Sequence, residues 1–182
     1  METAFSLGSN LGDRFAALVR ARDALGAVPG MRLLASSPVY ETDPVGVAPE
    51  HRDKPFLNAV VLLEGEAHTD VRTVARSARG IEDALGRRRD PQDRYAPRAI
   101  DIDMLYWGDL VLQTPELILP HPECLNRRFV CAPLADLRPA LRLPGVAHPV
   151  KDILEQLPEH PAVRRWPQAW PPPEPTTLPT SS

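Results

Sequence analysis

The sequence lacks the features that mark several large classes of protein. Its two cysteines, Cys124 and Cys131, are too few for a multi-disulfide framework, and no Cys-x-x-Cys pair suggests zinc. A formal charge of −3 and a pI near 6.0 disfavour general binding to nucleic acid, which favours a basic surface. No apolar run approaches the length of a transmembrane helix, and Met1–Leu7 is followed too soon by Asp13 and Arg14 for a signal peptide. We therefore expect a cytoplasmic protein without a membrane or nucleic-acid partner.

Proline, in contrast, is plentiful, and its distribution divides the chain. Eight of the 22 prolines fall between positions 158 and 179, and the last residues are rich in serine and threonine. Such a composition is typical of disordered segments. We predict one domain over residues 1–160, long enough to bury a core, and a disordered proline-rich tail over residues 161–182.

Hydrophobic periodicity predicts an α+β fold with the element order β-α-β-β-α-β. The expected strands cover residues 3–7, 31–42, 56–64 and 99–107, and the expected helices run from Asp13 to Leu25 and from Thr69 to Leu85. This order matches the ferredoxin-like arrangement, an antiparallel sheet with two helices on one face. It places the loops 43–55 and 86–98 at ends of the sheet where they can converge. A short helix over residues 150–157 belongs to a C-terminal extension.

The most informative stretch is Arg94–Asp103, a loop that leads into a strand. Pro97 stops helix formation, and the apolar and acidic residues that follow alternate with the period of a strand. Asp101 and Asp103 therefore share one face, with Cα atoms roughly 6.5–7 Å apart. Two carboxylates so close repel one another, which raises the pKa of at least one unless a cation lies between them. Beside Arg98, they suit Mg²⁺ and phosphate oxygens, as phosphoryl transfer requires. The alternative is an ordinary half-exposed strand with an acidic face.

The loop before this strand contains five arginines between positions 87 and 98. Guanidinium groups bind phosphate oxygens in a bidentate manner, so the loop is a candidate polyphosphate clamp. Asp90 and Asp93 dilute the positive charge, and a solvated basic loop is the alternative. The turn-rich stretch Gly8–Gly12 is not a Walker A sequence, because the Lys-Ser/Thr after the last glycine is missing.

Four further residues have both a structural and a functional interpretation. Asn58, near the start of an apolar strand, suits either a backbone hydrogen bond or ligand recognition, since an amide is both donor and acceptor. Glu82 falls on the apolar face of its helix and needs a partner, either a core arginine or a group in the site. His121 lies between two prolines in a rigid turn, where a structural role is common, and Phe129 would ordinarily be a core residue.

Five segments, in this order along the chain, resemble those of the 6-hydroxymethyl-7,8-dihydropterin pyrophosphokinase family of the folate pathway. The resemblance covers about residues 4 to 157 and rests on Leu7–Asp13, Tyr40–Gly46, Phe56–Val60, Arg94–Asp103 and Pro120–Phe129. The fourth segment is close to the family's most specific signature, Arg-x-x-Pro-Arg-x-Leu/Ile-Asp-Leu/Ile-Asp. Enzymes of this family transfer the terminal pyrophosphoryl unit of ATP to the pterin hydroxymethyl oxygen and release AMP.

The resemblance implies a role for each matching residue. Asp101 and Asp103 would hold two Mg²⁺ ions that bridge the triphosphate, with Arg87 and Arg98 as the catalytic arginines of the loop. The positions that match the family's ATP site are Glu82, Arg89, Arg94, Tyr95, His121 and Arg127. The positions that match its pterin site are Thr42, Pro44, Val45, Phe56, Asn58 and Phe129. We expect a monomer whose partners are the small molecules ATP, as co-substrate, and hydroxymethyldihydropterin.

A competing hypothesis is a ferredoxin-like module that uses the arginine loop to bind RNA or a nucleotide without catalysis. RNA-binding versions of that fold place aromatic residues on the central strands, and no such run is present in this sequence. The enzyme hypothesis leaves one role unassigned, because no residue stands out as a general base.

Overall fold

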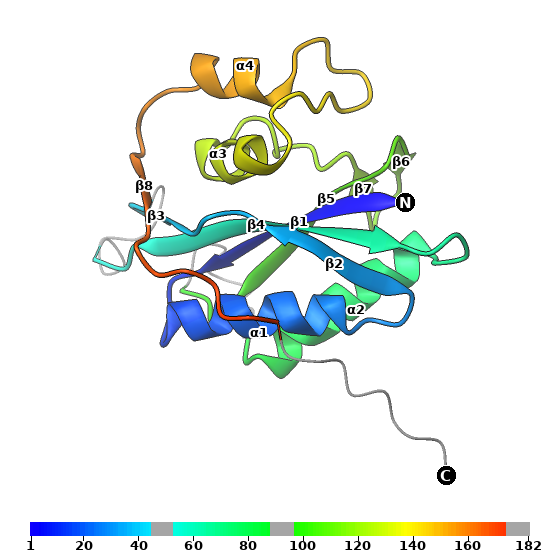
Figure 1. Ribbon diagram of the computed structural model, residues 1–182, viewed down its shortest axis with the longest axis horizontal. Helices are drawn as coiled ribbons and strands as arrows, with labels where there is room; N and C mark the ends of the chain where they lie inside the picture. The colour runs from blue at the N-terminus through cyan, green and yellow to red at the C-terminus, as the bar shows by residue number, and fades with distance from the viewer. Residues whose placement is uncertain (45–52, 88–96, 174–182) are drawn as a thin grey trace.

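A computed structural model describes residues 1–44, 53–87 and 97–173 of the chain (Figure 1). An antiparallel sheet lies between two helical layers, with α1 and α2 on one face and α3 and α4 on the other. Each helix in the described part of the chain is too short or too polar to span a lipid bilayer. The elements, in chain order, are β1 (Glu2–Ser9), α1 (Arg14–Gly26), β2 (Met31–Ser36), β3 (Tyr40–Thr42), β4 (Phe56–Gly65), α2 (Val71–Ala84), β5 (Asp101–Trp107), β6 (Leu112–Gln113), β7 (Ile118–Leu119), α3 (Arg128–Leu137), α4 (Val150–Gln156) and β8 (Val163–Arg165).

The main sheet has the strand order β5-β1-β4-β3-β8, and β2 also pairs with β4. Every pairing in this sheet is antiparallel. β1 pairs with β4 along its whole length, from Glu2 opposite Glu64 to Ser9 opposite Leu57. The predicted α+β class and antiparallel sheet are therefore confirmed.

The strand predicted over residues 31–42 is divided into β2 and β3. Pro38 has no backbone N–H to give to the ladder. At the break, the Ser37 hydroxyl accepts the Val60 backbone N–H at 3.0 Å, so a side chain replaces the usual backbone acceptor. The interruption leaves β3 as a short separate strand next to the start of β4.

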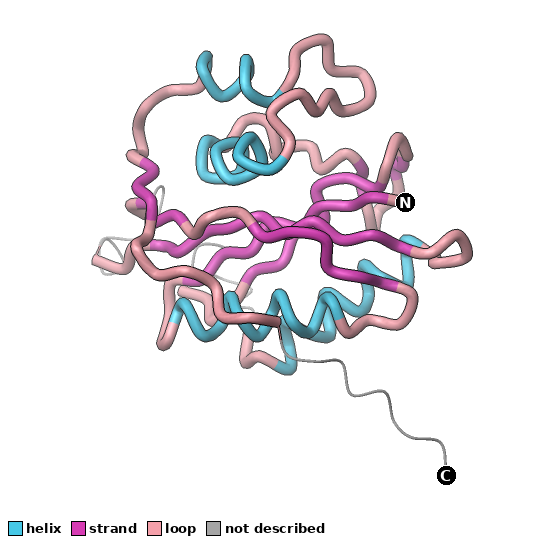
Figure 2. The backbone as a smooth tube through the Cα atoms, viewed as in Figure 1, coloured by secondary structure: helices cyan, strands magenta, loops and turns pink. Residues whose placement is uncertain are grey.

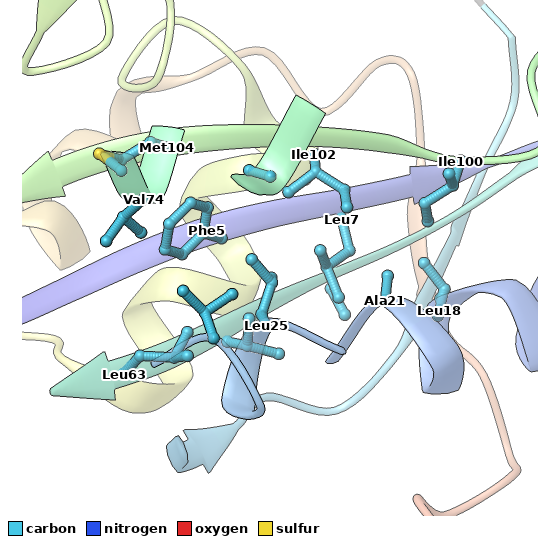
Figure 3. Close-up of a cluster of buried hydrophobic side chains, with 14 of the residues drawn as sticks. Phe5, Leu7, Leu18, Ala21, Leu25, Leu63, Val74, Ile100, Ile102 and Met104 are labelled. Carbon is cyan, nitrogen blue, oxygen red and sulfur yellow. The ribbon is translucent and has the colours of Figure 1, made fainter. Parts of the chain in front are cut away.

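Both faces of the sheet are buried, because the central strands carry apolar residues at successive positions. On β4, Val61 and Leu63 belong to a first core cluster with α1 and α2, whereas Val60 and Leu62 belong to a second core cluster with α3 and α4. Figure 3 shows the first core cluster, in which Phe5 of β1 lies among side chains of α1, α2 and β5. The prediction of two helices on one face holds for α1 and α2.

The sequence predicts only part of the second helical layer. α4 corresponds to the short helix expected over residues 150–157, but α3, which contains Pro133, is not among the predicted elements. A proline in a helix interior removes a backbone donor and usually breaks the helix. Burial of Val130, Cys131 and Leu134 in the second core cluster offsets that cost.

The predicted disorder of residues 161–182 is wrong for residues 161–173. Val163–Arg165 form β8, which pairs with β3, and Trp166 and Trp170 pack against the first core cluster. Figure 2 shows this segment leaving the α3–α4 layer, passing the edge of the sheet and reaching α1. Two indole rings and a strand pairing supply burial that the proline-rich composition conceals. Residues 174–182 lie outside the described part of the chain.

Candidate active site

A cavity of about 730 Å³, called here the larger cavity, is lined by residues of β1, β3, β4, β5 and α3. Leu105 and Val130 of its lining belong to the second core cluster, so the cavity lies on the face of the sheet that α3 and α4 cover. Asp43 at the start of one long loop and Arg87 and Arg98 at the two ends of the other also line it. The described ends of the two loops therefore converge, as the sequence predicts.

Asp101 and Asp103 of β5 both line the larger cavity, as their spacing predicts. The antiparallel ladder places Asp101 opposite Gly8 of β1 and Asp103 opposite Ser6. A Cβ atom at Gly8 would lie 3.3 Å from Asn58 Oδ1 and 3.9 Å from the Cβ of Asp101. A side chain at this position would crowd Asn58, so glycine leaves room for the Asn58 amide beside β1 and next to Asp101.

Two arginines neutralise the charge of Asp101. Arg87 Nη1 lies 2.6 Å from Asp101 Oδ1, and Arg98 Nη1 donates to Oδ2 at 2.5 Å. The three side chains are between 16% and 22% exposed, so water screens these pairs less than it screens pairs on an open surface. The arginine-rich loop is therefore, at its two described ends, bound to the diacid strand and not simply solvated.

Asp103 is in a less favourable environment. Burial raises its pKa, and the carboxylate of Asp101 raises it further, while the charges of His121, Arg127 and Arg87 oppose the rise. A divalent cation would relieve this repulsion, and Mg²⁺ is commonly held by one or two carboxylates together with phosphate oxygens and water. The described residues contain no group of three or more His, Cys, Asp or Glu side chains that could hold a metal ion. Two carboxylates on one wall suit a cation that also binds phosphate oxygens and water.

Glu82 of α2 is hydrogen-bonded to β5, the strand that carries the two aspartates. It is 2% exposed, and its Oε1 accepts the backbone N–H of Ile102, between the two aspartates, at 2.7 Å. The same oxygen accepts a hydrogen bond from Arg87 Nη1. Gly86 follows α2 with a φ of +87°, and the Arg87 N–H bonds the Glu82 carbonyl at 3.0 Å, as in a Schellman motif. One carboxylate thus positions both the strand and the loop arginine.

A polar pair and two aromatic rings form another part of the wall. Asn58 Nδ2 donates to Thr42 Oγ1 at 2.8 Å, and both residues are at most 3% exposed. Phe56 stands opposite Thr42 in the β3–β4 ladder and lines the same cavity. Phe129 also lines it, with the Arg127 guanidinium 5.9 Å from its ring centroid. Phe129 is therefore only partly a core residue, and the wall presents an amide beside flat apolar surfaces.

A smaller cavity of about 280 Å³ adjoins the larger one and shares Asp103 and His121 with it. Its other walls come from α2, β5 and residues 115–118. The backbone N–H of His121 bonds the Leu105 carbonyl at 2.8 Å, and its Nδ1 accepts the Glu123 N–H at 3.1 Å. In the neutral imidazole the proton is therefore on Nε2. His121 is a fixed donor at the junction of the two cavities.

Residues 4–139 match the family described as 7,8-dihydro-6-hydroxymethylpterin-pyrophosphokinase (HPPK). The chain belongs to this family. A 2-amino-4-hydroxy-6-hydroxymethyldihydropteridine pyrophosphokinase of Pseudomonas aeruginosa is 40% identical over 144 residues, which cover 79% of this chain and 84% of the relative. One of Porphyromonas gingivalis is 44% identical over 138 residues, which cover 75% of this chain and 90% of the relative.

Other similar proteins are longer than this chain. Folic acid synthesis protein fol1 of Schizosaccharomyces pombe is 34% identical over 154 residues, which cover 84% of this chain but 20% of the relative. The solved structure of Plasmodium falciparum HPPK-DHPS, wild type with pteroate, has a TM-score of 0.63 and 13% identity, covering 85% of this chain and 42% of that chain. At that identity, the structural match supports the fold alone.

Most residues that the HPPK resemblance assigns come together in this structure. Glu82 and Pro44 are exceptions, because neither residue is on the wall of either described cavity. Glu82 instead bonds the backbone of β5. The predicted residues that line the larger cavity are Thr42, Phe56, Asn58, Arg87, Arg98, Asp101, Asp103, His121, Arg127 and Phe129. The predicted residues that lie outside the described part of the chain are Val45, Arg89, Arg94 and Tyr95.

Three parts of these walls were not singled out by the sequence patterns. Ser6 lines the larger cavity, but a serine in a short apolar strand carries no signal for function, and the pattern around Gly8 predicted only a turn-rich loop and a family resemblance. The wall at residues 115–118 consists of ordinary loop residues. The segment from Leu157 to Pro161 contributes to the larger cavity where the sequence places the end of the domain.

Replacing Asp103 with asparagine should stabilise the metal-free protein near neutral pH. An acid whose pKa is raised by folding binds protons more tightly in the folded chain, so stability falls as the pH rises from the ordinary value of 3.8 to the raised one. Above the raised pKa, the full loss of folding stability is present. In calorimetry with a chelator at about pH 7, Asp103→Asn should melt a few degrees above wild type, and the difference should shrink toward about pH 4.

Asp109→Asn, in the exposed turn after β5, is the matched control for this measurement and should melt like the wild-type protein. If Asp103→Asn melts below wild type near pH 7, burial and repulsion do not act on this carboxylate as described.

Substitutions at Glu82 should separate its hydrogen bond to the strand from its charge. Glu82→Gln keeps an acceptor for the Ile102 N–H but loses the ion pair with Arg87. Glu82→Ala also leaves a buried N–H without its acceptor, which costs about 1–3 kcal/mol more. Urea unfolding should therefore rank wild type above Glu82→Gln, and Glu82→Gln above Glu82→Ala. The exposed neighbour Asp83→Ala should change stability by no more than about 0.5 kcal/mol. Equal stability of the two Glu82 variants would contradict the support of β5 by this carboxylate.

Proposed function

We propose that the protein transfers pyrophosphate from ATP to 6-hydroxymethyl-7,8-dihydropterin, giving AMP and the pterin diphosphate in folate biosynthesis. The observation that carries this proposal is the position of Asp101, Asp103, Arg87 and Arg98 on the wall of the larger cavity, where Asp103 also lines the adjoining smaller cavity. Two adjoining cavities can hold two substrates. The charged residues near the place where the cavities meet suit the pyrophosphoryl group that is transferred from one substrate to the other. The names of the curated relatives with 40% and 44% identity agree with this reaction.

The nucleotide would occupy the smaller cavity and extend its phosphates toward the larger one. Ala75, Ala78 and Met104 give the smaller cavity apolar surface for a base. His121 lines both cavities and can donate a hydrogen bond from Nε2 to a phosphate oxygen. Arg127 also lines the larger cavity and offers it a positive charge. This arrangement supports a path for the triphosphate across Asp103.

Asp101 and Asp103 would hold two Mg²⁺ ions, which, when bound, neutralise phosphate charge and align the β-phosphorus for in-line attack. Arg87 and Arg98 have guanidinium groups already directed at Asp101. Such groups bind phosphate oxygens as well as carboxylates, so they can stabilise charge that develops on the transferring group. Catalysis in this proposal comes from positioning and charge neutralisation, and it assigns no general base.

The acceptor would occupy the larger cavity. A pterin is flat with a polar edge, and Asn58 offers an amide for that edge while Phe56 and Phe129 offer rings to its faces. The bond from Asn58 Nδ2 to Thr42 fixes the orientation of the amide. The geometry therefore supports recognition of one edge of the heterocycle by a preorganised side chain.

The strand order and the two helices on one face also support assignment of the central sheet to the ferredoxin-like class. The monomeric state and the cytoplasmic location expected from the sequence stay predictions.

The direct test is nucleotide product analysis by chromatography. With ATP, Mg²⁺ and hydroxymethyldihydropterin, the protein should form AMP and pterin diphosphate in equal amounts, and no AMP without the pterin. Asp103→Ala should lose on the order of 10²–10³-fold in kcat or more, the loss typical of removing one group that stabilises transition-state charge.

Asp109→Ala, in the exposed turn after β5, is the matched acidic control and should keep wild-type activity. Formation of ADP in place of AMP, or full activity of Asp103→Ala, would refute the proposed reaction.

A further inference from the structure

The chain segment after α4 forms part of the wall of the larger cavity. We call residues 157–173 the C-terminal strap. Its cavity-lining residues are Leu157, Pro158, His160 and Pro161. All of them lie beyond residues 4–139, the range that matches the HPPK family. Part of this wall therefore comes from a segment that the family match does not include.

One end of the strap is tied to the helix start that carries Phe129. Arg128 Nη1 donates to the carbonyl oxygens of Leu154 and Leu157 at 3.0 and 3.1 Å. Arg128 is the first residue of α3, and Phe129 follows it directly. The strap therefore begins beside one of the aromatic surfaces of the larger cavity.

The middle of the strap meets the polar part of the same wall. Val163 of β8 stands opposite Thr42 of β3, which accepts the hydrogen bond from Asn58. Arg164 of β8 forms an exposed ion pair with Asp43 at 3.4 Å, and Asp43 also lines the cavity. The residues between Leu157 and Val163 therefore connect the aromatic side of the cavity to its polar side.

The far end of the strap is fastened to α1. Trp166 packs against the first core cluster, and Trp170 Nε1 donates to the Ser37 carbonyl at 2.6 Å. Arg22 of α1, which is 2% exposed, has its guanidinium 5.0 Å from the Trp170 ring centroid and donates to the Pro171 carbonyl at 2.9 Å. A buried guanidinium requires such partners. Figures 1 and 2 show the strap crossing from the α3–α4 layer, past β3, to α1.

We propose that the C-terminal strap is a specificity-determining wall of the acceptor site. Fastened at Trp170, it holds His160 and Pro161 at the larger cavity and limits the size of the heterocycle that fits between Phe129 and Thr42. The inference rests on the proposed function, since the acceptor is the pterin of that reaction. No described residue of the strap lines the smaller cavity, so the strap acts on the acceptor and not on the nucleotide.

The test uses full-length variants and two equilibrium measurements, pterin binding by fluorescence and binding of a non-hydrolysable ATP analogue by calorimetry. His160→Ala shortens an exposed side chain of the wall and should weaken pterin binding about three- to tenfold. Trp170→Ala removes the contacts that fasten the strap to α1 and should weaken pterin binding about tenfold. Trp170→Phe keeps a ring against Arg22 and Phe15 and should restore most of the affinity. The affinity for the nucleotide analogue should stay within about twofold in every variant.

A size test uses the same variants. The ratio of kcat/KM for hydroxymethyldihydropterin to that for an analogue with an added ring methyl group should fall in His160→Ala and Trp170→Ala. His148→Ala is the matched control, because His148 is also exposed and also precedes a proline but does not line the cavity. It should change neither affinity nor the ratio.

Unchanged pterin affinity in both His160→Ala and Trp170→Ala, or equal weakening of pterin and nucleotide, would overturn the proposal. If Trp170→Ala does not fold, His160→Ala decides the question. A wild-type protein that binds no pterin would overturn the proposed function and the acceptor role of the strap together. Wild-type pterin binding with unaffected variants would overturn the strap's role alone.

Discussion

Electrostatic repulsion between Asp101 and Asp103 is the constraint on which the rest of the site depends. Two acids two residues apart on one strand cannot both stay charged in a partly buried place without compensation. Arg87 and Arg98 compensate Asp101 directly, at 2.6 and 2.5 Å. Glu82 holds the strand between the acids and one of those arginines. Burial first, and then the carboxylate of Asp101, raise the pKa of Asp103, and a bound cation would favour its charged form.

Arg87 and Arg98 would have two partners in turn. In the structure they bond Asp101, and a magnesium nucleotide offers a cation to the carboxylates and phosphate oxygens to the guanidiniums at the same time. When the nucleotide binds, the arginines would exchange the Asp101 carboxylate for phosphate oxygens while the cation takes their place at Asp101. The charges of the cluster would then stay balanced before and after binding. The fold makes this possible because Glu82 is buried and hydrogen-bonded to β5, whereas Arg87 and Arg98 stand at the two ends of a loop.

Local patterns in the sequence predict the parts of this site that depend on local geometry. The two-residue period over 99–107 places both aspartates on one face, as observed. The bond between Asn58 and Thr42 depends on the β3–β4 register, and the partner of Glu82 depends on how α2 ends, so neither follows from spacing. Proline misled the prediction of the tail, because the proline-rich C-terminal strap is held by burial of indole rings. The predicted elements also did not include α3, which contains Pro133. The roles of Val45, Arg89, Arg94 and Tyr95 stay predictions, because they lie outside the described residues.

The most direct measurement of the central claim is a Mn²⁺ titration followed by electron paramagnetic resonance, with and without a non-hydrolysable ATP analogue. If Arg87 and Arg98 compete with the metal for Asp101, Mn²⁺ should bind at least about tenfold more weakly without the analogue, and Arg98→Ala should narrow the difference. With the analogue, wild type should bind two Mn²⁺ ions per chain beyond what the free analogue binds, and Asp103→Asn should bind fewer. Equal Mn²⁺ affinity with and without the analogue in wild type would contradict the claim that these arginines and the metal share one carboxylate.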